Sequence, residues 1–103
     1  MTEYQITYWR ELPSLVVARG GGLVAKCPLP QRFQEAIDEA AMRLGDVGSE
    51  AYLAGWRRTD WTDLDGSTAD VAEQVAADLE RQWPAAAVDA YLDGLAGARE
   101  DAT

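Results

Sequence analysis

The feature that most constrains the fold is the alternation of side chains at the start of the chain. Over residues 3–10, Tyr4, Ile6 and Tyr8 fall on one side of an extended segment, and the residues between them fall on the other: Gln5, Thr7 and Trp9. Alternation of aromatic and β-branched residues is typical of a β-strand. A sheet with one apolar side needs a second layer to cover it, and amphipathic helices can supply that layer.

Two further strands are predicted to complete an antiparallel meander. Pro13 interrupts the first strand, because proline has no N–H to donate and disfavours helix before it. Apolar segments at 15–18 and 23–27 then flank a triple glycine at 20–22, and glycine tolerates the positive φ angles of a tight reversal. A phosphate-binding loop would need a Lys-Ser or Lys-Thr pair that leads into a helix. The triple glycine lacks both, so we interpret it as a hairpin turn.

Helical patterns dominate the rest of the chain. Apolar residues recur at helical spacing, and residues that favour helix ends lie at the boundaries. The predicted helices are 30–44, ended by Gly45; 49–56, capped by Ser49; a longer helix from Ser67 or Thr68 to about Trp83; and, after Pro84, 85–95. Between them, residues 56–61 alternate large and polar side chains and are predicted to add a fourth strand.

These elements predict an α+β fold. We expect a two-layer sandwich in which a three- to four-stranded, mostly antiparallel sheet is packed by two main amphipathic helices and a short C-terminal helix. A chain of 103 residues is long enough for one domain. We place that domain at residues 1–96 and expect residues 97–103 to be a frayed C-terminal tail.

Charge restricts the partners that the chain can bind. Its net charge is −9, and the whole excess lies in residues 59–103, which hold eleven acids and two bases; residues 1–58 hold seven of each. Phosphate backbones and anionic membranes attract basic surfaces, so we expect neither nucleic acid nor membrane as a partner. No apolar run is long enough for a membrane span, and we expect a cytoplasmic protein with an unpaired Cys27.

Residues suited to catalysis or metal binding are scarce. The chain has no histidine and one cysteine, so the common proton shuttle and a thiolate cluster are both missing. The acids of the 60–68 loop do not match the spacing of a calcium-binding loop, and they suit the start of a helix instead. For Cys27 we favour a small strand residue over a nucleophile. We expect no catalytic residue, metal or cofactor, and we favour a non-enzymatic role.

Tryptophan–arginine pairs are the strongest candidates for a binding site. Trp9 and Arg10 end the first strand, and Trp56, Arg57 and Arg58 begin the fourth. Tryptophan and arginine are enriched at binding hot spots, since they bury large areas and form bidentate hydrogen bonds. The competing interpretation is structural, with the indoles filling a thin core and the arginines pairing with nearby acids. The sequence leaves both open.

Two segments carry a resemblance to a small bacterial family. YWRELP at residues 8–13 and RFQEAIDEAAMRLG at 32–45 are distinctive, and WRR follows at 56–58. Over about residues 3–60 the chain is similar to the virulence factor domain found in proteins that resemble conserved virulence factor C. The positions that match the family's motif are Tyr8, Trp9, Arg10, Pro13, Arg32, Phe33, Ala36, Ile37, Met42, Arg43, Trp56, Arg57 and Arg58.

The resemblance implies little about activity. It implies no catalytic residue and links the chain by name to virulence-gene expression. The genes of family relatives occur beside genes for folate- and corrinoid-linked methyl transfer, and this neighbourhood does not establish a function. We therefore favour an accessory domain that binds a protein partner through the Trp–Arg residues. A binder or enzyme subunit for an anionic small molecule such as a folate-type carboxylate, clamped by Arg10, Arg57 and Arg58, is the second hypothesis. A structural homo-oligomer formed through an exposed strand edge is the third.

Overall fold

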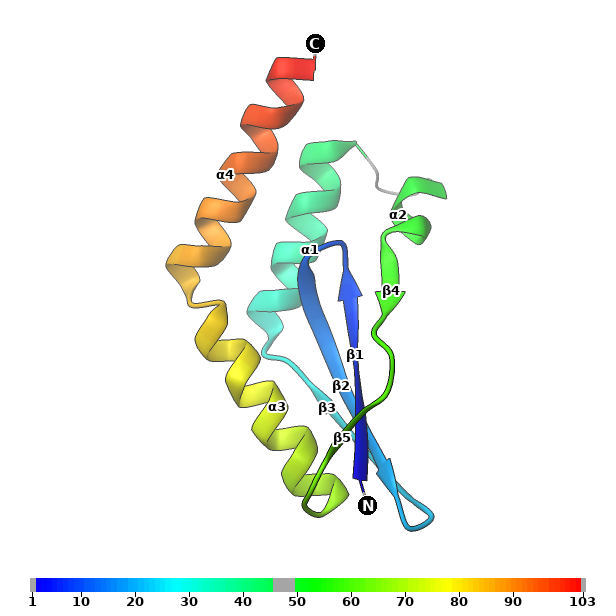
Figure 1. The fold of residues 1–103 in the computed structure, drawn as a ribbon. Coiled ribbons are helices and arrows are strands. Elements are labelled where there is room, and N and C mark those ends of the chain that lie inside the picture. Colours follow the sequence, from blue (N-terminus) through cyan, green and yellow to red (C-terminus); the bar gives the residue numbers. More distant parts are fainter. Residues whose placement is uncertain (1, 46–49, 103) are drawn as a thin grey trace.

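The computed structural model describes residues 2–45 and 50–102. A twisted antiparallel sheet runs along the molecule, and helices pack against it (Figure 1). The strands are β1 Thr2–Trp9, β2 Leu12–Gly20, β3 Leu23–Pro28, β4 Trp56–Arg58 and β5 Thr62–Leu64. Their order is β3-β2-β1-β4, and β5 also pairs with β1. The predicted α+β class and the N-terminal meander are therefore confirmed.

The meander has a glycine turn between β2 and β3 and a proline near the start of β2. Gly21 and Gly22 have φ angles of 57° and 79°, so the predicted glycine hairpin is confirmed. Pro13 does not separate the strands as expected, because β2 already begins at Leu12. The pairing of β1 with β2 shifts between Thr7 and Tyr8, opposite this proline. Such an irregularity accommodates a residue that cannot donate to the ladder, which explains the difference.

The helices are α1 Gln31–Leu44, α2 Glu50–Ala54, α3 Thr68–Gln82 and α4 Ala85–Ala102. Gly45 ends α1 with a left-handed φ of 73°, as predicted. The Ser67 hydroxyl accepts a hydrogen bond from the Asp70 N–H and caps α3, also as predicted. Ser49 lies outside the described residues. The predicted fourth strand is two short strands, and α4 extends past the expected end at Leu95.

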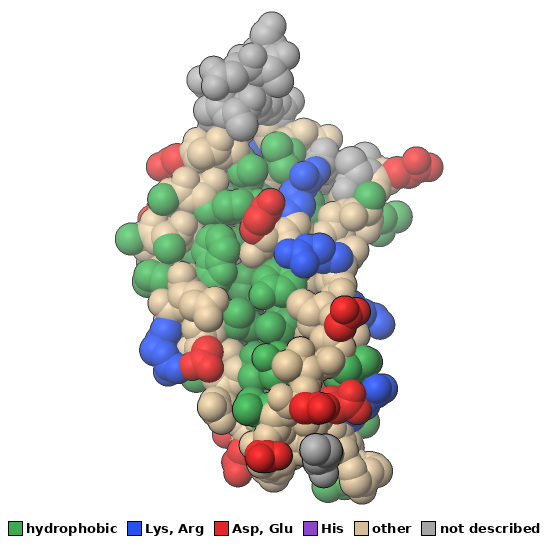
Figure 2. Space-filling model, viewed as in Figure 1, with side chains coloured by type: hydrophobic (Ala, Val, Ile, Leu, Met, Phe, Trp, Pro, Cys, Tyr) green, Lys and Arg blue, Asp and Glu red, His purple; other side chains and the backbone are tan. Residues whose placement is uncertain are grey.

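The core has two parts, which lie under different helices. In one part, α3 packs across β1, β2 and β3 and buries residues such as Val71 and Val75 against Val16. In the other, α1 and α4 pack together beside the β1–β2 turn. Figure 2 shows a band of apolar side chains running between the α3–α4 arm and the strands. Each part is thin, so a single large side chain contributes much of it.

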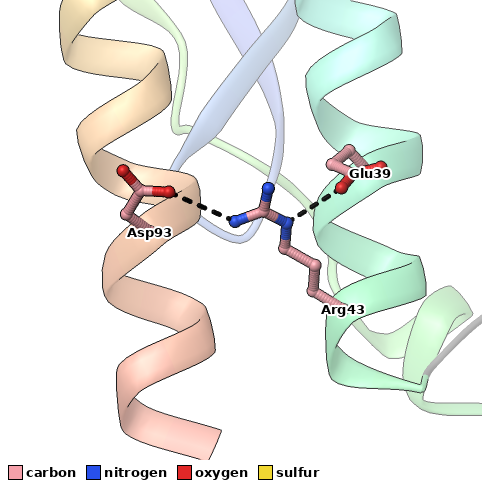
Figure 3. A network of polar contacts seen from close by, with 3 residues as sticks. All are labelled: Glu39, Arg43 and Asp93. Carbon is pink, nitrogen blue, oxygen red and sulfur yellow. Dashed lines mark hydrogen bonds and ion pairs between the residues drawn. The ribbon is translucent and has the colours of Figure 1, made fainter.

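An ion-pair network joins α1 to α4. The Arg43 Nε lies 2.9 Å from the Glu39 carboxylate, and its Nη1 lies 3.5 Å from that of Asp93 (Figure 3). Glu39 and Arg43 belong to α1, whereas Asp93 belongs to α4. The network therefore helps to hold α1 against α4. The three side chains are between 33% and 82% exposed, so water screens their charges. We therefore expect these ion pairs to contribute modestly to stability.

Tyr91 fastens α4 to the turn between β1 and β2. Its hydroxyl donates to the Glu11 carboxylate at 2.6 Å, and its ring meets Trp83 edge-on at 5.7 Å. Burial raises the pKa of Tyr91 well above the ordinary tyrosine value, and the hydrogen bond to Glu11 raises it further. The phenol therefore stays protonated in the folded protein at pH values where it would ionise in the unfolded chain.

This shift predicts a specific alkaline transition. Because the folded pKa is the higher one, the stabilisation is complete below the usual tyrosine pKa of about 10 and is lost as the pH rises beyond it. Tyr91→Phe should cost about 1 kcal/mol at neutral pH and flatten the fall in stability above that value. Urea unfolding at a series of pH values measures both effects. An unchanged alkaline slope in Tyr91→Phe would show that another group causes the transition.

Candidate functional site

Trp9 lies in the core and not on the surface. Its side chain is 0% exposed, and its Nε1 donates to the Tyr52 carbonyl at 2.8 Å. The two rings lie 5.8 Å apart. A Cβ placed on Gly55 would come within 2.6 Å of the indole nitrogen, so the glycine permits this close approach. Trp9 thus holds the α2–β4 segment against β1.

Arg10 strengthens the same junction through its backbone. Its φ is 53°, an unusual value for a residue other than glycine. The Arg10 N–H donates to the Gly55 carbonyl at 2.8 Å, and its own carbonyl accepts from the Arg57 Nε at 3.0 Å. These two bonds hold the strained turn in place. We call Trp9, Arg10, Tyr52 and Gly55 the turn clamp.

Arg57 lies between the clamp and the surface. Its guanidinium stacks on the Tyr8 ring at 4.5 Å while its Nε is bound to the Arg10 carbonyl, and the side chain is exposed. Stacking and one fixed hydrogen bond reduce the entropy that an arginine loses when it binds a partner. Trp56 is half-buried and meets Tyr52 edge-on at 6.2 Å. Arg58 is exposed and pairs with Thr7 across β1.

A hollow of about 600 Å³ opens beside these residues. Its lining is neutral or basic throughout: Thr7, Ser14, Leu15, Trp56, Arg57 and Arg58. Ser14 is the extra residue of the irregular pairing, because Thr7 faces Leu15 and Tyr8 faces Pro13. Bulges of this kind often redirect side chains near binding sites. We call this concavity the β4 hollow; its guanidinium and hydroxyl groups suit a carboxylate.

The structure therefore divides the five predicted site residues. Trp56, Arg57 and Arg58 line the β4 hollow together. Arg10 lines a neighbouring depression with Arg57, and Trp9 is buried beneath them. The geometry brings three of the five to one concavity and gives Trp9 a packing role.

Comparison with protein-family models adds a second kind of evidence. Residues 7–91 match the model of a family described as Virulence factor, and this span includes the turn clamp, the β4 hollow and most of the helical layer. The chain belongs to the Virulence factor family. Comparison with curated proteins and with solved structures found no match. Family membership confirms the resemblance of the two motif segments and leaves the molecular function to be argued from the site.

Cys27 and the acidic side chains are the other candidate groups of this Virulence factor domain. Burial raises the pKa of the Cys27 thiol, and the carboxylates of Glu73 and Glu80 on α3 raise it further, which disfavours a reactive thiolate. Within residues 2–45 and 50–102, no three acidic or cysteine side chains gather as metal ligands. The helices described there include none with the length and apolarity needed to cross a bilayer.

A groove lined by residues of both charges lies between α1 and α4. About 360 Å³ in volume, it is lined in part by Arg32, Glu35, Glu39 and Asp89. Arg32 donates to the Trp83 carbonyl at 2.6 Å, and Glu39 is engaged with Arg43. The Arg32 hydrogen bond joins α1 to the junction of α3 and α4, and the groove has Glu35 and Glu39 on its α1 wall and Asp89 on its α4 wall.

Sequence reasoning missed two features of the site. Gly55 directly precedes Trp56, and a glycine beside a tryptophan in a thin core is a signal for close backbone approach. Arg19 stacks on the Trp61 ring at 3.7 Å and lies 3.7 Å from the Glu3 carboxylate. The partners of Arg19 lie far from it in the sequence, and no local pattern predicts these contacts.

Proposed function

We propose that this member of the Virulence factor family is a non-enzymatic interaction domain that binds a protein partner through the β4 hollow. The observation that carries the proposal is the meeting of one half-buried tryptophan and two exposed arginines on a concave surface. Trp56 offers a large apolar contact, and Arg57 is already oriented by Tyr8 and the Arg10 carbonyl. Such residues supply most of the binding energy at protein interfaces.

Electrostatics supports the same site. Arg57 and Arg58 belong to no ion pair in the described part of the chain, although the protein as a whole is strongly acidic. Elsewhere, Arg19, Arg43 and Arg81 each have an acidic partner. Exposed arginines without an internal acid remain available to a carboxylate on another molecule.

A pair of charge reversals tests this function. Arg58→Glu should reduce the capture of partner protein from a bacterial lysate about fivefold, because it replaces an attraction by a repulsion at the hollow. Arg81→Glu is the matched control, since it makes the same change in net charge on α3. Quantitative affinity capture measures the effect, and thermal unfolding checks that both variants fold. Equal capture by Arg58→Glu and the unchanged protein would contradict the proposal.

A small anionic molecule is a second candidate for the same hollow. Trp56 beside Arg57 and Arg58 could stack on a flat ring while a guanidinium binds its carboxylate, as in a pterin bearing a glutamate tail. Titration of tryptophan fluorescence with folate distinguishes this case. Saturable quenching that Arg58→Glu abolishes would favour the small molecule over the protein partner.

A further inference from the structure

We infer that the partner contributes an acidic segment, in extended form, that crosses the sheet from Arg58 on β4 to Lys26 on β3. The inference rests on the proposed function and specifies the chemistry of the partner. It depends on the side of the sheet that carries Thr7, Leu15 and Val17, which we call the open sheet face. These side chains belong to neither of the two parts of the core.

The charges of the chain are divided between the sheet and the helices. The five strands carry four bases, Arg19, Lys26, Arg57 and Arg58, against two acids, Glu3 and Asp63. By contrast, α3 alone carries four acids and one base. Strand register places Arg19, Lys26 and Arg58 on the open sheet face together with Glu3 and Asp63, so this face carries one more base than acid although the whole chain has a net charge of −9. A surface of this sign attracts carboxylates even though the whole chain is acidic.

The bases of the open sheet face differ in whether an acidic side chain of the protein lies beside them. Arg19 has both Glu3 and the Trp61 ring as neighbours. Lys26 and Arg58, both exposed, form no ion pair with any described residue. They are the two positions at which an external acid would meet an unopposed positive charge.

Strand register places these two bases at the ends of one path. Arg58 pairs with Thr7, and Thr7 pairs with Leu15. Lys26 pairs with Val17, two positions further along β2 than Leu15. With strands about 4.8 Å apart and about 3.4 Å per residue, the path from Arg58 to Lys26 spans about 16 Å. An extended chain covers that distance in about five residues.

The floor of this path is apolar in the middle. Leu15 and Val17 are half-buried and lie between the two bases, while the Leu15 end opens into the β4 hollow. The matching segment has an acid at each end and an apolar residue between them. A nucleic acid offers no apolar middle, and its phosphates would be repelled by the acidic helices. These features favour a protein segment.

Purified components test the inference directly. The probe is a fluorescein-labelled peptide in which glutamate alternates with valine, and its control replaces each glutamate by glutamine. Fluorescence anisotropy with the full chain should show saturable binding of the glutamate peptide that weakens as salt rises. Lys26→Glu and Arg58→Glu should each weaken it about fivefold, and Arg81→Glu should leave it within about twofold. Thermal unfolding confirms the fold of each variant.

Several outcomes would overturn the inference. These are equal weakening by Arg81→Glu, equal binding of the glutamine peptide, or tighter binding of a single-stranded oligonucleotide. A dimer in sedimentation that Lys26→Glu dissociates would assign the open sheet face to a second copy instead. If lysate capture depends on Arg58 but the glutamate peptide does not bind, the interaction function stands and the acidic segment is wrong. If neither depends on Arg58, both proposals fail.

Discussion

Trp9→Ala is expected to lower the free energy of unfolding by about 3–5 kcal/mol. The indole is fully buried and supplies the contact between β1 and the α2–β4 segment. Its removal leaves a cavity and takes away one of two donors to the Tyr52 carbonyl, which keeps the Gly55 N–H at 3.2 Å. Because domains of this size have about 5–15 kcal/mol in total, a large share of the stability is lost. Chemical denaturation followed by far-ultraviolet circular dichroism measures the loss.

Two further variants separate the contributions of the Trp9 side chain. Trp9→Phe keeps most of the ring but removes the N–H, so its cost should be about 1–3 kcal/mol. Trp56→Ala is the positional control, because its half-buried side chain lies directly across from Trp9 in the sheet. We expect it to cost less than Trp9→Ala. The opposite ranking would mean that the turn clamp is not the main support of this end of the sheet.

Gly55→Ala is expected to lower the free energy of unfolding by about 1–3 kcal/mol, although it adds only one methyl group. The new Cβ would lie 2.6 Å from the Trp9 Nε1 and 2.8 Å from its Cε2. The indole cannot move away, because it is fully buried and hydrogen-bonded. The strain therefore falls on the bond from the Arg10 N–H to the Gly55 carbonyl. The midpoint of thermal unfolding should fall by several degrees.

Gly94→Ala is the matched control for that substitution. Gly94 lies in α4, and a Cβ there would meet no atom within 4 Å. Alanine is the better helix former by up to about 1 kcal/mol, so this variant should be neutral or more stable. Equal destabilisation by the two substitutions would show that added bulk at Gly55 is not the cause. No loss of stability in Gly55→Ala would contradict the close approach to Trp9.

The turn clamp also determines which residues can report on function. A substitution at Trp9 or Arg10 would abolish binding by disturbing the fold, so it could not identify a contact. Arg58 and Lys26 are exposed and outside the core, and their variants should fold normally. Arg57 is intermediate, because its Nε supports the turn while its exposed guanidinium lies at the proposed binding surface.

Local patterns predicted the elements that local physics controls. Alternation identified β1, the triple glycine identified the β2–β3 hairpin, and Gly45 and Ser67 marked helix ends. Each depends on backbone preferences within a few residues. The position of Pro13 inside β2 was not predictable in this way. It depends on a pairing irregularity that only the neighbouring strand creates.

The candidate site shows the same division at the level of single side chains. Trp9 and Trp56 looked equivalent in the sequence, since each is followed by arginine. They differ because the α2–β4 segment returns beside β1 and encloses Trp9, while Trp56 remains at the sheet edge. Lys26 had no distinguishing pattern at all. Its interest depends on the strand order, which places it across the open sheet face from Arg58.

By itself, the sequence determined the α+β class, the family and the presence of Trp–Arg pairs, because composition, periodicity and motif spacing are properties of neighbouring residues. The tertiary structure decided which tryptophan is core, which arginines have no acidic partner among the described residues, and where the basic residues lie relative to one another. Those depend on contacts between β1 and a segment more than forty residues away. Burial and electrostatic interaction are set by distance in space, which local sequence patterns do not encode.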